Sequence, residues 1–342
     1  MELNKLMLHI PDFIKTYSFM LFISLLVRRL TGHNINPLII RDMFSEAVDT
    51  LRAHSEYLNQ INVFPVPDGD TGINMLMTMQ KVNDTLNQEA SHTLKSLTAA
   101  IEKGAFDGAK GNSGIILSQF FMGVCRVLAP LENLSLSSFK EAMSEGAEYA
   151  KDAVLNPREG TMISVMRDTA YAGKESSSWH EYFQVTFEKA QESIRSSPEF
   201  LPELKKAGVY DSGAIGFLYI YQAWINSLSR ALESSDTWLH DEQLDNSKIE
   251  LDGSEFADQI RYRFCTEGRI MVDAIDEKAI RSLLETIGDS LLLISSHQNG
   301  LSEFKIHLHT NTPSALYNTL CKFGSVLSIK IDDMKVQTIT TH

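Results

Sequence analysis

The spacing of hydrophobic residues divides the chain into a helical part and a part that alternates as strands do. Before Asn59, apolar residues recur every three or four positions: Ile40, Phe44, Ala47 and Leu51. This spacing predicts an amphipathic helix. Further helices are predicted over residues 75–86 and 93–103. We find no convincing strand alternation between residues 34 and 232, so this part of the chain is predicted to be all-helical.

From residue 260 onward the periodicity changes to that of β-strands. The predicted strands cover residues 260–266, 290–295, 304–310 and 326–331, and the predicted helices cover residues 277–287 and 313–321. The order strand, helix, strand, strand, helix, strand predicts a small α+β domain.

Two further segments differ from both parts. The apolar run from Tyr17 to Val27 has eleven residues, fewer than the ~20 that cross a bilayer, and Arg28 and Arg29 follow where a signal peptide would have small residues. We interpret it as part of an N-terminal extension, with membrane-surface contact as the alternative. A later stretch rich in Ser, Asp and Glu is typical of a linker. The predicted organisation is an extension (1–32), a helical domain (33–232), a linker (233–254) and an α+β domain (255–342).

Composition restricts the class of protein. The 342 residues suggest two domains, and the net charge of -13 argues against a nucleic-acid partner, since nucleic-acid binding draws on Lys and Arg. The three cysteines, Cys125, Cys265 and Cys321, are odd in number and far apart. This pattern favours a reducing cytoplasm without a disulfide framework.

The segment from Asn62 to Met75 carries the clearest candidate chemistry. Asp68 and Asp70 flank a glycine and follow two prolines, so the segment cannot be the interior of a helix. Two carboxylates held close together are the hard oxygen ligands that Mg²⁺ prefers. The alternative is a surface turn, because Pro, Asp and Gly are common turn residues.

Three more glycine-containing loops each lead into a predicted helix. They end with Gly111-Asn-Ser-Gly114, with Glu159-Gly-Thr-Met162 and with Asp211-Ser-Gly213. Backbone N–H groups at a helix start bind phosphate without lysine side chains. The alternative is that the glycines only allow close packing between helices. Four such loops would form one site if they lay across one end of an all-α barrel or bundle.

The α+β part contains a candidate zinc site. His307 and His309 lie two residues apart in a predicted strand, so both imidazoles project from one face. With Cys265 they form a zinc-competent set that leaves one coordination position open. The alternative is two half-exposed histidines and an inert buried cysteine.

These motifs, in this order, resemble the nucleotide-binding L subunit of dihydroxyacetone kinase, and more closely the N-terminal domain of the bacterial fatty-acid kinase ATP-binding subunit. The matching stretches are NVFPVPDGDTGINM, KGNSGIILSQ, REGTMISV and GVYDSGAIGF. The later stretches RYRFCTEGRIMV, GDSLLLI, KIHLHTNTP and GSVLSIKIDDMKVQ are similar to the middle domain of that subunit. The resemblance implies an all-α antiparallel helical barrel, with ATP and Mg²⁺ in the loops at one end, followed by a small α+β domain.

The resemblance also implies roles for individual residues. Asp68 and Asp70 would be the catalytic, magnesium-binding aspartates, and Asn62 is the nearest candidate for a third ligand. The implied nucleotide contacts are Thr71, Gly72, Asn74, Gly111, Asn112, Ser113, Gly114, Thr161, Met162, Asp211, Ser212 and Gly213. Cys265, His307 and His309 match the residues that bind zinc in that family. Two positions depart from the family pattern, Ile73 in place of Thr and Ala214 in place of Gly.

The function implied is an ATP- and Mg²⁺-dependent phosphotransferase that converts the carboxylate of a carrier-bound fatty acid to an acyl phosphate. An ionised carboxylate needs no catalytic base, which fits this acceptor. The expected partner is a fatty-acid-binding carrier protein, whose docking domain usually follows the middle domain and is expected to be lacking here. A homodimer is left open. The alternatives are a dihydroxyacetone-type kinase and a non-catalytic nucleotide-binding regulatory module.

Overall fold

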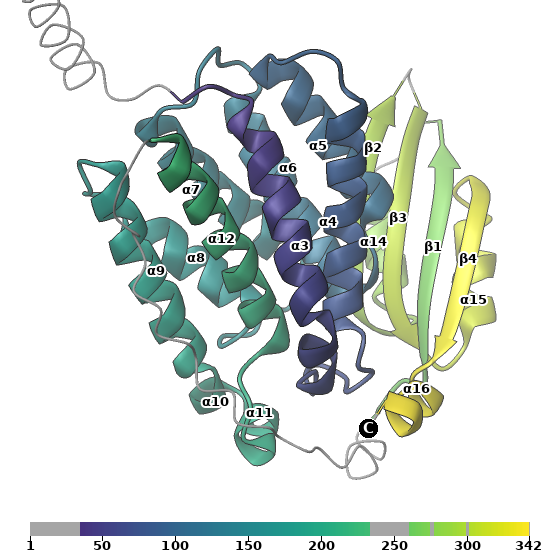
Figure 1. Cartoon of the computed structure of the whole chain (residues 1–342). Coiled ribbons are helices and arrows are strands. Elements are labelled where there is room, and N and C mark those ends of the chain that lie inside the picture. The colour runs from purple at the N-terminus through teal and green to yellow at the C-terminus, as the bar shows by residue number, and fades with distance from the viewer. Residues whose placement is uncertain (1–34, 233–259, 274–276, 299–300, 342) are drawn as a thin grey trace, which may run out of the picture.

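The computed structural model describes residues 35–232, 260–273, 277–298 and 301–341. The predicted extension over residues 1–32 and the predicted linker over residues 233–254 lie outside the described residues. The described part consists of a helical barrel followed by a small α+β unit with one four-stranded sheet (Figure 1). This confirms the predicted fold class.

Eight long helices form the barrel. They are α3 (Ile39–Gln60), α4 (Thr71–Gln88), α5 (Leu94–Gly108), α6 (Gly111–Leu128), α7 (Leu136–Asp152), α8 (Met162–Ala172), α9 (Trp179–Arg195) and α12 (Ser212–Ala231). The short helices α10 (Ser197–Phe200) and α11 (Pro202–Ala207) connect α9 to α12. Successive long helices run antiparallel, and α12 packs against α3, which closes the barrel (Figure 1). None of the helices among the described residues has the length and apolar character needed to span a bilayer.

The antiparallel arrangement brings the functional loops together. Because the long helices alternate in direction, α4, α6, α8 and α12 all begin at the same end of the barrel, the lower end in Figure 1. The four glycine-containing segments immediately precede or open these helices. The predicted gathering of the loops at one end is therefore a consequence of the helix order.

Local sequence and core packing hold these helices in place. Thr93, Ser135, Ser178 and Asp211 each accept a hydrogen bond from a first-turn N–H and so cap α5, α7, α9 and α12. Inside the barrel, aromatic side chains pack together, among them Phe44, Phe120, Phe121, Phe217 and Trp224. This core gives the loops a rigid support.

The α+β unit has the predicted order of elements. They are β1 (Phe264–Val272), α14 (Glu277–Leu284), β2 (Asp289–Gln298), β3 (Leu301–Thr310), α15 (Pro313–Leu320) and β4 (Ser325–Asp333), followed by α16 (Met334–Thr341), which was not predicted. The strands are antiparallel in the order β2-β3-β1-β4. β1 begins at Phe264 rather than at Ile260 because its partners β3 and β4 end opposite Phe264, at Thr310 and Asp333.

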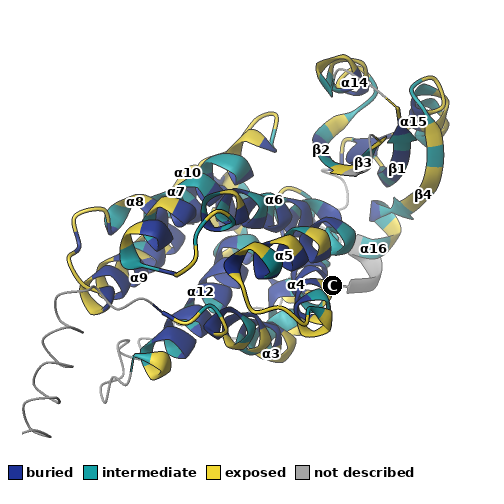
Figure 2. Ribbon diagram, turned by 90° about the horizontal axis from the view of Figure 1, so that it is seen from above, coloured by how far each residue is buried: buried dark blue, intermediate teal, exposed yellow. Residues whose placement is uncertain are grey.

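The two faces of the sheet differ. One face carries apolar side chains such as Ile270, Phe304 and Leu308, which pack with α14 and α15. The alternate residues of β1 and β3 point the other way, toward the barrel, and are mostly polar: Cys265, Glu267, Arg269, Lys305, His307 and His309. Figure 2 shows the sheet beside the barrel end of α6 and α4.

Candidate metal and nucleotide site

The loop before α4 is braced from within. Gly69 adopts a positive φ of 66°, which permits the sharp turn between Asp68 and Asp70. Asn62 is buried, and its Nδ2 donates to the Val66 carbonyl at 2.8 Å and to Asp68 Oδ1 at 3.4 Å. Its Oδ1 accepts from the backbone N–H of Thr71 at 3.1 Å and from the Thr71 hydroxyl. The geometry therefore favours Asn62 as a brace of the loop over its predicted role as a third magnesium ligand.

Three parts of the chain meet at one small cavity. It is lined by the loop from Asn62 to Thr71, by Gly111, Asn112 and Ser113 at the start of α6, and by His307 of the middle strand β3. Its volume of about 20 Å³ corresponds to one or two water molecules or ions. The predicted metal loop, the predicted phosphate loop and one predicted zinc ligand thus share a cavity.

The two aspartates in this cavity destabilise each other's charge. Burial, together with the charge of Asp70, raises the pKa of Asp68 well above its ordinary value. Burial also raises the pKa of Asp70, while the amide of Asn74 and the charge of His307 act in the opposite direction. A cation between the two carboxylates would relieve this cost, since an opposite charge favours the ionised form.

The segment Gly111–Gly114 is the first turn of α6 rather than a loop before it, because Lys110 is the last extended residue. Gly111 has a φ of +61°, and a Cβ there would lie 2.2 Å from Asn74 Nδ2. Asn74 is 1% exposed, and neither of its amide atoms forms a hydrogen bond of normal geometry with the described residues. Leaving a buried polar group unpaired costs about 1–3 kcal/mol. The paired absence of a side chain at Gly111 and of a partner for Asn74 fits a site that receives a ligand.

The predicted zinc ligands are together and buried. Cys265 Sγ lies 3.7 Å from His307 Nδ1, and the Nε2 atoms of His307 and His309 are 3.2 Å apart. One ligand atom from each of the three residues lies within 4.8 Å of the others. Cys265 is the second residue of β1, not the end of a strand as predicted, and faces His309 across the sheet.

Each histidine of this cluster has a carboxylate near its other ring nitrogen. Glu267 Oε1 lies 3.6 Å from His307 Nδ1, and Asp289 Oδ1 lies 3.7 Å from His309 Nδ1. Metal-binding histidines usually have such carboxylate partners, which orient the ring. Glu267 was not predicted as a site residue, although strand alternation places it on the same face as Cys265.

Charge is unevenly distributed over the cluster. Burial lowers the pKa of His307, but the neighbouring Cys265 and Glu267 outweigh this effect and raise it well above its ordinary value. Burial and the charge of His307 lower the pKa of His309 to about 3, so His309 is neutral at physiological pH. Burial raises the pKa of Glu267, but His307 and the Gly111 N–H outweigh it and bring the pKa to about 2. Without a metal, Glu267 and His307 therefore form a buried ion pair.

The third and fourth loops are joined to each other. Asp211 Oδ1 accepts from the N–H of Ala214 at 2.8 Å, capping α12, and from the N–H of Met162 at 3.0 Å, at the start of α8. The Ser212 hydroxyl donates to the Leu58 carbonyl at 2.6 Å, and the Thr161 hydroxyl donates to the Arg158 carbonyl at 2.8 Å. These polar side chains brace the loops.

The third loop also reaches the first, since the Arg158 guanidinium lies 6.0 Å from the centre of the Phe64 ring. The four loops are therefore at one end of the barrel. Several predicted nucleotide contacts lie outside the lining of the small cavity: Gly72, Asn74, Gly114, Thr161, Met162, Asp211, Ser212 and Gly213.

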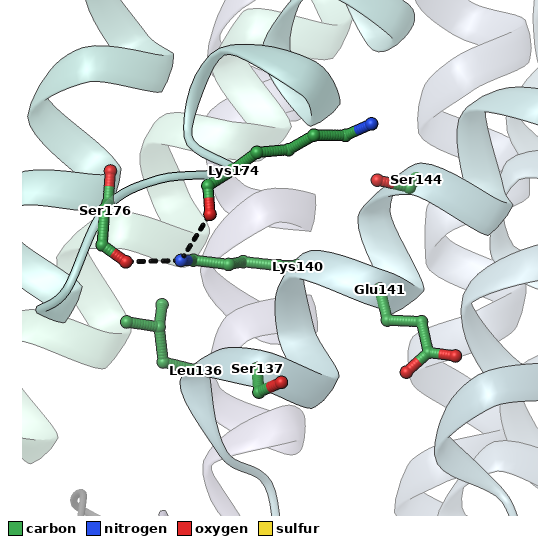
Figure 3. A pocket seen from close by; sticks show the side chains of 7 residues that line it. All are labelled: Leu136, Ser137, Lys140, Glu141, Ser144, Lys174 and Ser176. Atoms are coloured by element: carbon green, nitrogen blue, oxygen red, sulfur yellow. Dashed lines mark hydrogen bonds between the residues drawn. The ribbon is translucent and has the colours of Figure 1, made fainter.

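A separate groove lies at the opposite end of the barrel, between the start of α7 and the segment after α8 (Figure 3). Lys140 Nζ donates to the carbonyl of Lys174 at 3.1 Å and to that of Ser176, so the amine holds two backbone segments together. The Lys174 side chain extends past it toward Ser144 (Figure 3). The groove is remote from the four loops, and we assign it no function.

Two family models match the chain along its length. The DAK2 domain model matches residues 65–226, which places the barrel in the class of dihydroxyacetone-kinase-type domains. The FakA-like middle-domain model, which describes the middle domain of a fatty acid kinase, matches residues 261–341. The chain therefore belongs to the FakA-like family of fatty acid kinases, in which these two domains are joined.

Similar proteins occur in staphylococci. Uncharacterized proteins of Staphylococcus haemolyticus and Staphylococcus epidermidis are 31% and 32% identical over 312 residues, covering 89% of this chain and 56% of each relative. The chain spans just over half the length of these curated relatives. A solved dihydroxyacetone kinase from C. freundii, in complex with AMP-PNP and Mg²⁺, aligns with a TM-score of 0.45 and 19% identity, over 57% of this chain and 35% of that one.

Proposed function

We propose that the chain is an ATP- and Mg²⁺-dependent phosphotransferase whose acceptor is the carboxylate of a fatty acid presented by a carrier protein. The observation that carries this proposal is the shared cavity of Asp68, Asp70, the start of α6 and His307. It joins the candidate metal loop of a kinase-type domain to the polar face of the middle domain. The product would be an acyl phosphate.

Phosphoryl transfer depends on positioning and on charge neutralisation more than on covalent chemistry by the protein. Asp68 and Asp70 would hold Mg²⁺, which when bound neutralises charge on the triphosphate. The first-turn N–H groups of α6 have no acceptor within the helix and would hold phosphate oxygens. Asn62 keeps the metal loop in place through its hydrogen bond from Thr71.

The cluster of Cys265, His307 and His309 fits zinc by its donor set, because a thiolate and two imidazoles leave one of the four tetrahedral positions open. The carboxylates of Glu267 and Asp289 would orient the two rings. Zinc when bound would supply a Lewis acid at the edge of the magnesium site. The chain's own contribution is to hold these ligands buried on the sheet face that meets the barrel.

The middle domain favours a fatty-acid acceptor over a small hydroxylated one. Its polar face covers the mouth of the candidate site with His307, so the acceptor must reach the site at the boundary of two domains. An acyl carboxylate is ionised at neutral pH and requires no base to attack a phosphorus atom. Dihydroxyacetone presents a hydroxyl group and would require one.

ATP consumption measured with different acceptors tests the proposal. The chain is assayed in Mg²⁺ with a fatty-acid-loaded carrier protein, with the empty carrier and with dihydroxyacetone, and Asp70→Asn and Asp84→Asn serve as the inactive variant and the matched surface control. We expect turnover with the loaded carrier alone, lost in Asp70→Asn and retained in Asp84→Asn. Turnover with dihydroxyacetone alone would replace the acceptor, and nucleotide binding without any turnover would indicate a regulatory module.

A further inference from the structure

Glu267 of the middle domain reaches across the domain boundary to the barrel. Its Oε1 accepts a hydrogen bond from the backbone N–H of Gly111 at 2.7 Å. This N–H is the first of α6, where the positive end of the helix dipole favours an anion. A carboxylate of the protein itself therefore occupies one of the groups that a nucleotide phosphate would use.

A second polar contact accompanies it. Lys305 lies on β3 with its side chain on the same face as that of Glu267, and its Nζ donates to the Asp107 carbonyl at 2.8 Å. That carbonyl belongs to the last turn of α5, where the negative end of the dipole favours a cation. The sheet thus places an anion on the start of α6 and a cation on the end of α5.

The rest of the boundary is lightly packed. Its buried apolar contact is a small cluster of Phe106, Ile115, Leu292 and Ile294. Two cavities, of about 550 Å³ and about 200 Å³, are both lined by Glu267 and Lys330. The contact between Glu267 and Gly111 can therefore break without disrupting the core of either domain.

An independent sign of a ligand lies directly beside this contact. The Asn74 amide is buried and lacks a hydrogen bond of normal geometry among the described residues. It lies against Gly111, where a Cβ would be 2.2 Å from Nδ2. Glu267 bonds the Gly111 N–H and leaves this amide unsatisfied, so the carboxylate fills the site incompletely.

We propose that Glu267 is an internal competitor for the phosphate group of the nucleotide. The inference rests on the proposed function, since it takes the start of α6 as the phosphate site. In the free protein the carboxylate holds the Gly111 N–H and keeps the middle domain against the barrel. A bound nucleotide displaces the carboxylate from Gly111, so that part of its binding energy is used to open the boundary.

Calorimetric titration with AMP-PNP in the presence of Mg²⁺ tests the competition. Glu267→Gln removes the charge, and Glu267→Asp keeps the charge but shortens the side chain so that it no longer reaches Gly111. Because hydrogen bonds to charged groups are about twice as strong as neutral ones, we expect the Kd of AMP-PNP to fall by about fivefold to tenfold in both variants. The affinity for adenosine, which has no phosphate, should not change.

Glu277→Gln is the matched control, because Glu277 lies on α14 of the same domain and pairs with Arg281. It should bind AMP-PNP as the wild type does. An unchanged or weaker AMP-PNP affinity in both folded Glu267 variants would overturn the inference, as would an equal gain for adenosine. A wild type that binds no AMP-PNP would instead remove the proposed function, and the inference with it.

Discussion

Asp211 and Met162 join two helices of the barrel: the buried carboxylate accepts the Met162 N–H at 3.0 Å while it also caps α12. The two loops are distant in the sequence, and this contact fixes the start of α8 against the start of α12. Burial raises the pKa of Asp211 to about 7, although the N–H groups of Ala214 and Met162 lower it. The carboxyl group therefore gains or loses its proton near neutral pH.

Asp211→Asn should change how stability depends on pH. Because the pKa is about 7 in the folded state and 3.8 ordinarily, the folded state binds more protons between these values, and stability falls as pH rises through this window. Asparagine cannot ionise, so the melting temperature of Asp211→Asn relative to wild type should be higher at pH 8 than at pH 5. The difference corresponds to roughly 2–4 kcal/mol at most. A difference that does not vary with pH would contradict the raised pKa.

Asp70→Asn should stabilise the protein in the absence of Mg²⁺. The pKa of Asp70 is raised mainly by burial, so its ionised form is unfavourable at pH 8 when no cation is present. We expect a melting temperature a few degrees above wild type in EDTA. Added Mg²⁺ with AMP-PNP should raise the melting temperature of the wild type and of Asp84→Asn but not that of Asp70→Asn. Equal responses in all three proteins would contradict the metal site.

Asn62→Asp distinguishes a brace from a metal ligand. An aspartate would lose the hydrogen bonds donated to Val66 and Asp68 and would add a charge beside Asp68. We therefore expect lower stability, by about 1–3 kcal/mol, and weaker Mg²⁺-dependent binding of AMP-PNP. A direct magnesium ligand would show the opposite, because a carboxylate binds Mg²⁺ more strongly than an amide does. Denaturant unfolding and titration calorimetry measure the two effects.

The purified protein should contain one zinc ion per chain by elemental analysis. The double variant Cys265→Ser with His307→Ala removes two of the three ligands and should lower the zinc content to background. Cys321→Ser is the control, since Cys321 is exposed and lies outside the cluster. A wild type prepared without chelators that holds no zinc would contradict the site.

The sequence was sufficient for most elements of the fold. The four glycine-containing segments marked the starts of α4, α6, α8 and α12, and alternation located all four strands. The helices α7 and α9 were not delimited individually. The start of α7 is a capping box in which Ser135 pairs with Ser138, whereas Glu or Gln is typical at the latter position, so the usual signal was missing.

The arrangement of the site was less accessible from the sequence. The motifs identified Asp68, Asp70 and the Cys265, His307 and His309 cluster, but not that His307 lines the same cavity as the aspartates. Which sheet face meets which helices depends on long-range packing, here the cluster of Phe106, Ile115, Leu292 and Ile294. The part of Glu267 depends on the same packing, because its partner Gly111 belongs to the other domain.

The central claim is that the start of α6 and the Asp68–Asp70 loop hold a nucleotide and its metal ion at the boundary of the two domains. A crystal structure with AMP-PNP and Mn²⁺ in place of Mg²⁺ tests it most directly, because anomalous scattering locates manganese. We expect manganese bound by Asp68 and Asp70, with a phosphate on the N–H groups of Gly111 to Ser113. Manganese and nucleotide bound elsewhere, for instance in the groove beside Lys140, would contradict the account.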